Sequence, residues 1–145
     1  MSDAADPPSK AQGRPRVLIV EDDPFISTDV QLALIDAGYE VCGVASNEQE
    51  ALEMARATRP TLAVLDVQLD PGDGKTVARA LATNYGTTVL MASAEPPSTL
   101  DGIGAVGVVP KPYDANIIPA ALEAADAIAE GDDPGPLPDH MQRLS

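Results

Sequence analysis

The chain has 145 residues, 44% of them apolar, and a formal net charge of −14, which suits one cytoplasmic domain with a substantial core. The acidic balance excludes functions that rest on direct binding to nucleic acid or to an anionic membrane, because both depend on Lys and Arg. The single cysteine, Cys42, excludes an intrachain disulfide and a cysteine-rich zinc site, and no apolar run has the length of a membrane span or a signal-peptide core.

Composition divides the chain into three parts. Residues 1–14 are small, polar and proline-containing, and we expect a flexible N-terminal arm. Residues 131–145 contain three prolines and no hydrophobic periodicity, so we expect an acidic, proline-rich tail. The ordered domain is therefore predicted over residues 15–130.

Five short apolar runs alternate with helix-like stretches along this domain. Each run is continuously apolar, without the alternation typical of a strand that has one face in water. Strands covered by helices on both faces have this composition, which is typical of parallel sheets. The predicted strands are 17–20, 41–44, 62–65, 88–91 and 105–109.

Helix signals fill the segments between these runs. Asp23 and Pro24 form an N-cap and first-turn pair, and Gly38 ends that helix. Residues 47–50 resemble a capping box, and helical spacing predicts further helices over 75–84 and 117–128. Between the fourth and fifth predicted strands, prolines and glycines leave room for about two turns of helix. The order predicts an α/β domain, a doubly wound five-stranded parallel sheet with a short or irregular fourth helix.

Polar side chains follow four of the predicted strands. Glu21 and Asp22 follow the first, Asp66 ends the third, Ser93 ends the fourth, and Lys111 follows the fifth. The functional crevice of an open parallel sheet lies beyond the carboxyl ends of its strands, so we expect these side chains to converge.

This set of residues predicts phosphoryl chemistry. The loop after the first strand lacks the glycines of a phosphate-cradling loop, whereas clustered carboxylates suit a hard cation such as Mg²⁺. Asp66 is a candidate nucleophile because carboxylates form acyl phosphates, and Lys111 and Ser93 are candidates to hold phosphoryl oxygens.

Four motifs at these strand ends carry a family resemblance. VLIVEDDP, LDVQLDPGDG, VLMASA and VPKPYD occur in this order, and residues 16–130 resemble the receiver domain of two-component response regulators. The resemblance implies a flavodoxin-like (βα)5 fold in which Asp66 accepts phosphate from a histidine kinase or phosphotransfer protein. It also implies that Mg²⁺ is held by Glu21, Asp22, Asp66 and the backbone carbonyl of Gln68. Ser93 and Lys111 would stabilise the phosphoryl group, and the bond from Lys111 to Pro112 would be cis.

The chain departs from the family pattern on the output side. Val108 stands where the family usually has an aromatic residue, and the distance from Ser93 to Lys111 is shorter than usual. Both features resemble small stand-alone receivers. We therefore expect a non-enzymatic signalling protein, a monomer or weak homodimer without its own output domain. Its output would be target binding, relay or a phosphate sink.

Two other functions are consistent with parts of the sequence. One is an interaction scaffold on a receiver fold that works without phosphorylation. The other is a phosphatase with an aspartate nucleophile, although Gln68 stands where such enzymes usually have a second acid. For partner docking, Phe25, Ile26 and Tyr113 are candidate contacts for a kinase helix, and the alternative for Phe25 is a place in the core.

Overall fold

The computed structural model describes residues 15–145, so the arm predicted over 1–14 lies outside the described residues. Strands and helices alternate from β1 to α4. The elements are β1 (Arg16–Val20), α1 (Pro24–Asp36), β2 (Glu40–Ala45), α2 (Glu48–Thr58), β3 (Leu62–Asp66), α3 (Gly74–Tyr85), β4 (Thr88–Ser93), the 3₁₀ helix η1 (Pro97–Leu100), β5 (Gly107–Pro110), the 3₁₀ helix η2 (Ala115–Ile117), α4 (Ile118–Ala129) and β6 (Gln142–Arg143).

The strands form one sheet in the order β2-β1-β3-β4-β5-β6. Neighbouring strands from β2 to β5 are parallel, and β6 is antiparallel to β5. The predicted doubly wound α/β class is confirmed, with six strands in place of the five expected. The strand order reverses at β1 and β3, and an α/β sheet of this kind places its functional site beside that point.

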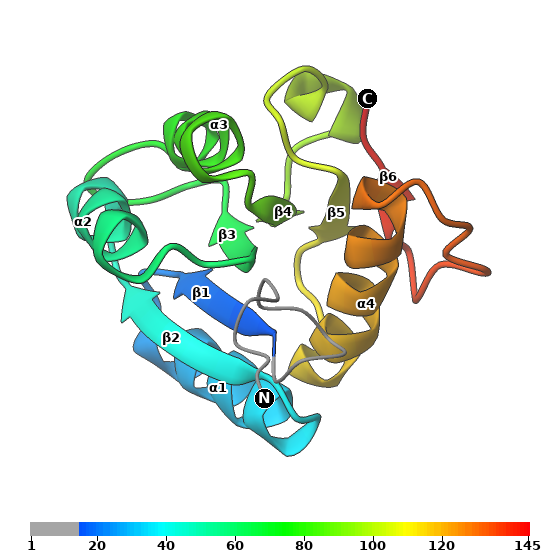
Figure 1. Ribbon diagram of the computed structural model, residues 1–145, viewed down its shortest axis with the longest axis horizontal. Helices are drawn as coiled ribbons and strands as arrows, with labels where there is room; N and C mark the ends of the chain where they lie inside the picture. The colour runs from blue at the N-terminus through cyan, green and yellow to red at the C-terminus, as the bar shows by residue number, and fades with distance from the viewer. Residues whose placement is uncertain (1–14) are drawn as a thin grey trace, which may run out of the picture.

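Helices cover both faces of the sheet (Figure 1). Buried residues of α1 and α4, including Leu34 and Leu122, share one core cluster with one face of the strands. Buried residues of α2 and α3, including Ala55 and Leu81, form the second cluster with the other face. Burial on both faces explains why β1, β3 and β4 have continuous apolar sequences.

Side-chain caps fix where α1 and α2 begin. The Asp23 carboxylate accepts hydrogen bonds from the N–H groups of Phe25 and Ile26, as the sequence predicts. The Asn47 side chain accepts the N–H of Glu50. The Glu50 carboxylate reaches back to the N–H of Ser46, one residue before the position of an ordinary capping box. These caps place both helix starts directly after β1 and β2.

The connection between β4 and β5 has little helix. It contains the four-residue 3₁₀ helix Pro97–Leu100, which confirms the prediction of a short fourth helix. Pro119 lies in the first turn of α4, where proline does not disrupt a helix.

The segment expected to be a proline-rich tail contains the sixth strand. Gln142 pairs with Val108 of β5, and Arg143 pairs with Gly107. Met141 is buried, and Leu144 and Leu137 pack against the two core clusters. The sequence gives no strand pattern here because this strand depends on pairing with a distant part of the chain.

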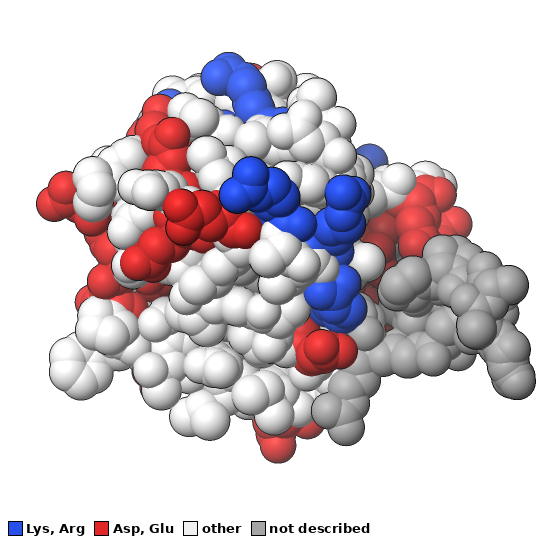
Figure 2. Space-filling view, turned by 60° about the vertical axis from the view of Figure 1, so that its left-hand side comes forward, with Lys and Arg blue, Asp and Glu red and all other residues white. Residues whose placement is uncertain are grey.

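Charged side chains are unevenly distributed on the face shown in Figure 2. Asp and Glu side chains are most numerous on the left of this view, with smaller groups at its right and lower edges, and most of the Lys and Arg side chains in view lie near its centre. The sequence as a whole has 23 acidic and 9 basic residues. Within residues 15–145, no helix combines the length and hydropathy needed to cross a membrane.

Candidate phosphoryl-transfer site

Three carboxylates meet where β1 and β3 lie side by side. Glu21 and Asp22 follow β1 directly, and Asp66 is the last residue of β3. One carboxylate oxygen from each side chain lies within 4.8 Å of the others. Glu21 and Asp66 are buried, whereas Asp22 is exposed to solvent. The convergence expected from the sequence is therefore present in the structure.

Lys111 completes this group with a positive charge. Its Nζ lies 2.8 Å from Asp66 Oδ2, and the Asp66 side chain is only 4% exposed. The backbone N–H of Lys111 donates to the carbonyl oxygen of Ser93, which ties the β5 loop to the end of β4. The bond between Lys111 and Pro112 is cis. Lys111 thus holds its ammonium group against the candidate nucleophile.

A glycine permits the close approach of α3 to the end of β3. A Cβ atom on Gly74 would lie 2.1 Å from the carbonyl oxygen of Asp66 and 2.8 Å from the Cα of Val67. No other residue has space there. The N–H of Gly74 donates to the carbonyl of Val67, and the N–H of Gln68 donates to Asp66 Oδ1. These contacts fix the backbone that carries Asp66.

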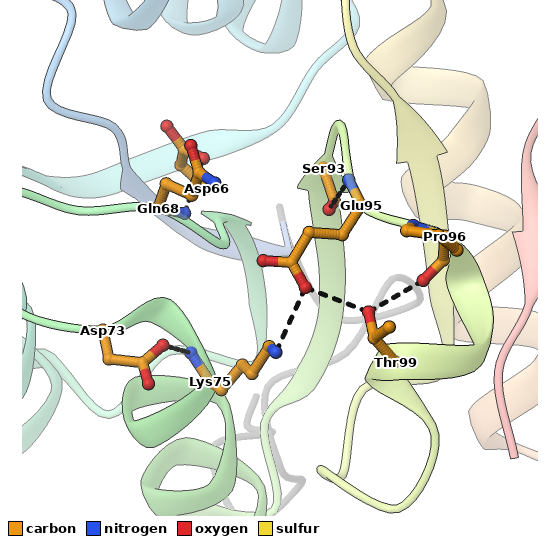
Figure 3. Close-up of polar contacts among 8 residues, drawn as sticks. All are labelled: Asp66, Gln68, Asp73, Lys75, Ser93, Glu95, Pro96 and Thr99. Carbon is orange, nitrogen blue, oxygen red and sulfur yellow. Dashed lines mark hydrogen bonds and ion pairs between the residues drawn. The ribbon is translucent and has the colours of Figure 1, made fainter.

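Ser93 lies at the end of β4, the strand next to β3. It is 2% exposed, and its Oγ accepts the N–H of Glu95 at 2.8 Å. Figure 3 shows Ser93 at the strand end and Asp66 at the end of the neighbouring strand. Ser93 therefore connects the site to the loop that follows β4.

An ion pair beside this site was not anticipated from the sequence. Lys75 of α3 reaches Glu95 at 3.1 Å, and Glu95 also accepts the hydroxyl of Thr99 (Figure 3). The ammonium of Lys75 and then the Thr99 hydroxyl lower the pKa of Glu95. The only sequence feature that points to Glu95 is its position two residues after Ser93. The ion pair links α3 to the loop that Ser93 holds.

Burial raises the pKa of Glu21 from 4.5 to about 7. This value is a net result: the N–H of Asp23 and the charge of Lys111 lower the pKa of Glu21, whereas the Asp66 carboxylate adds to the rise from burial. Burial, followed by Glu21 and Asp66, also raises the pKa of the Tyr113 hydroxyl, so Tyr113 stays protonated beside the acids. A cation bound beside the three carboxylates would favour the ionised form of Glu21 and reduce the repulsion between them.

The donor set fits a hard divalent cation. Carboxylate oxygens are the ligands that Mg²⁺ prefers, and Mg²⁺ keeps several water or phosphate oxygens in its shell. Glu21, Asp22 and Asp66 supply such oxygens within a short span. The backbone carbonyl of Gln68, in the loop that follows Asp66, remains a predicted fourth ligand.

Cation binding should therefore depend on pH. We expect the apparent Mg²⁺ affinity to rise about tenfold from pH 6 to pH 8, because Glu21 must lose its proton first. Titration calorimetry at several pH values measures this, and Glu21→Gln should flatten the profile. Equal affinities of the wild type at pH 6 and pH 8 would contradict the assignment.

The same raised pKa predicts how stability changes with pH in metal-free protein. Glu21 binds its proton more tightly in the folded state, so its stabilising contribution is complete below pH 4.5 and is lost as pH rises toward 7. The loss is roughly 3 kcal/mol at most. Chemical denaturation of the wild type and of Glu21→Gln across this range measures the difference.

A family model of the response regulator receiver domain matches residues 17–123, most of the chain. The chain belongs to the response regulator receiver family. This receiver is 32% identical over 114 residues to the transcriptional regulatory protein PdtaR of Mycobacterium tuberculosis, an alignment that covers 76% of this chain and 56% of PdtaR. The receiver thus spans about half the length of that relative.

Solved receiver structures have the same architecture. The receiver domain of a modulated diguanylate cyclase from Desulfovibrio desulfuricans matches with a TM-score of 0.72 and 29% identity, covering 81% of this receiver and 97% of that chain. The anti-anti-sigma factor PhyR of Bartonella quintana matches with a TM-score of 0.67 and 27% identity, covering 83% of this receiver and 50% of PhyR. The receiver fold and family are thus supported by both sequence and structure.

The outer face of α1 in this receiver is unusually apolar. Phe25 is 82% exposed, Leu32 61% and Ile35 49%. Their spacing places them near one side of the helix, while Val30 and Leu34 are buried against the sheet. The alternative that Phe25 is a core residue is therefore wrong. Ile26 and Tyr113 are instead partly buried against the core.

Proposed function

We propose that this receiver accepts a phosphoryl group on Asp66 from the phosphohistidine of a kinase or phosphotransfer protein. The observation that carries the proposal is the contact of 2.8 Å between Lys111 Nζ and Asp66 Oδ2 beside a cluster of carboxylates. A buried acid in contact with an ammonium group, with further acids able to bind a cation, provides the groups that phosphoryl transfer requires.

In this proposal Asp66 is the nucleophile, and Lys111 neutralises negative charge during the transfer. A carboxylate oxygen of Asp66 attacks phosphorus, the new O–P bond forms as the N–P bond breaks, and the donor's imidazole leaves. Lys111 neutralises charge on the transferring group. Mg²⁺, when bound by Glu21, Asp22, Asp66 and the Gln68 carbonyl, supplies further neutralisation of phosphoryl oxygens. Ser93, at the end of the neighbouring strand, donates its hydroxyl to the phosphorylated product.

The apolar side chains on α1 provide a surface for the donor protein. Phe25 lies two residues after Asp23, at the start of the helix that follows the acidic loop. An exposed apolar stripe on one helix is typical of a protein–protein contact. We propose that helices of the phosphodonor protein pack on this stripe and hold the phosphohistidine in line with Asp66. Such positioning accounts for much of the rate of a transfer reaction.

The direct test is chemical. The protein is incubated with Mg²⁺ and a small acyl phosphate, and its intact mass is measured before and after treatment with hydroxylamine, which cleaves acyl phosphates. We expect one added phosphoryl group, removable by hydroxylamine and located on the peptide that contains Asp66. A protein that never gains the group would fit the scaffold alternative. Turnover without a detectable adduct would fit the phosphatase alternative.

Replacing Phe25 with Ala should separate docking from chemistry. We expect transfer from a phosphorylated cognate donor protein to slow about tenfold or more, because an exposed apolar anchor is lost. Transfer from the small acyl phosphate should stay at the wild-type rate. Glu40→Ala, an exposed change at the start of β2, is the control. Equal slowing with both donors would show that Phe25 is not part of the docking surface.

A further inference from the structure

The C-terminal segment closes an edge of the sheet that would otherwise be open. β5 would be the last strand, and its outer N–H and C=O groups would face solvent without β6. The family model ends at residue 123, inside α4, so this segment lies beyond the part of the chain that the model matches. The edge of β5 is therefore covered by a segment outside the matched region.

Few backbone contacts hold the segment in place. Only two residue pairs join β6 to β5. The N–H of Leu144 donates to the carbonyl of Val106, and the chain is fastened again by two bonds between Ser145 and the loop at Asp101 and Gly102. A two-residue strand at a sheet edge is among the elements of a protein that open most readily.

Side-chain packing supplies the rest of the attachment. Met141 is 5% exposed and belongs to the cluster beneath α1 and α4, whereas Leu144 packs against the cluster on the other face. The fit depends on Gly107, since a Cβ there would lie 2.7 Å from the Cε of Met141. The Met141 side chain therefore occupies the space beside Gly107 of β5 and helps to hold the strand in place.

The segment also borders the loop that follows β4, the strand next to the one that ends in Asp66. A cavity of about 70 Å³ lies between the segment and the end of β4, and its lining includes Ser93, Glu95, His140 and Gln142. Val108, which pairs with Gln142, lines it as well. Ser93 holds the N–H of Glu95, so a change at Ser93 moves the wall that faces the segment.

We propose that residues 137–145 are a releasable strand that masks the β5 edge until Asp66 is phosphorylated. The inference rests on the proposed function. A phosphoryl group on Asp66 offers new acceptor oxygens to the Ser93 hydroxyl. The movement of Ser93 draws the Glu95 loop away from His140 and Gln142, and the short ladder then opens. Release exposes the outer N–H and C=O groups of β5 to solvent.

Amide hydrogen exchange of the full chain tests this inference. The Leu144 amide reports the strand because it is hydrogen-bonded to Val106, and the Thr88 amide, bonded to the carbonyl of Thr61, reports the sheet at the ends of the strands opposite Asp66. With Mg²⁺ and a small acyl phosphate, we expect the Leu144 amide to exchange at least tenfold faster, with no change at Thr88. The intact mass of the same sample gives the extent of phosphorylation.

Variants of the strand provide the control. Met141→Ser should release the strand without phosphorylation, so its Leu144 amide should already exchange fast. Arg143→Ser, an exposed change in the same strand, should behave as the wild type. A phosphorylated protein with unchanged Leu144 exchange would overturn the inference and leave the proposed function standing. A protein that cannot be phosphorylated would overturn both.

Discussion

Replacing Asp66 with Asn is expected to abolish phosphoryl incorporation from both a donor protein and a small acyl phosphate. The amide cannot supply the anionic oxygen that attacks phosphorus, and no other group takes its place against Lys111. The fold should persist, because the amide is close in size to the carboxylate and relieves repulsion with Glu21. Intact mass after incubation with donor and Mg²⁺ measures the effect.

Asp70→Asn is the matched control for this experiment. Asp70 lies four residues after Asp66, in the loop that follows β3, and its side chain is exposed. We expect this variant to gain the phosphoryl group at the wild-type rate. Retention of wild-type incorporation by Asp66→Asn would refute the assignment of the acceptor.

Lys111→Ala is expected to slow phosphorylation roughly hundredfold and to remove the response that follows it. Loss of one charged group that faces a transferring phosphoryl commonly has an effect of this size. Lys111 also lowers the pKa of Glu21, so its removal raises that pKa further and weakens cation binding near neutral pH. Rates of incorporation at fixed donor and Mg²⁺ concentrations, with thermal unfolding as a check on the fold, measure the loss.

Lys75→Ala distinguishes the loss of any lysine from the loss of this one. Lys75 pairs with Glu95 at a site where both side chains are more than a quarter exposed, and an ion pair of this kind contributes about 0.5 kcal/mol. We expect the variant to be phosphorylated at close to the wild-type rate. Similar slowing in both lysine variants would show that net charge, and not the contact with Asp66, governs the reaction.

The parallel sheet and the position of the site could be predicted because both depend on local sequence. Continuous apolar runs identify buried strands, and Asp23 and Pro24 identify the start of α1. The carboxyl ends of parallel strands lie at one edge of the sheet, so Asp66 and Lys111 could be placed together although 45 positions separate them.

Features that depend on long-range contacts were beyond prediction. Residues 142–143 become a strand only because the edge of β5 is available to them. Met141 packs beside Gly107 of β5, and the sequence around neither residue indicates this contact. The exposure of Phe25 likewise depends on which side of α1 meets the core. The ion pair of Lys75 with Glu95 joins α3 to the loop after β4, and the distance between these two elements depends on the whole fold.

The two sides of α1 have different consequences for how this protein can evolve. Val30 and Leu34 face the core, so truncating either side chain costs stability. Phe25, Leu32 and Ile35 face solvent, and their replacement leaves the core intact. If the stripe binds the phosphodonor as proposed, a duplicated copy could acquire a new donor by substitutions on this outer stripe alone. Loss of the old donor and recognition of a new one would then both arise without compensating changes in the core.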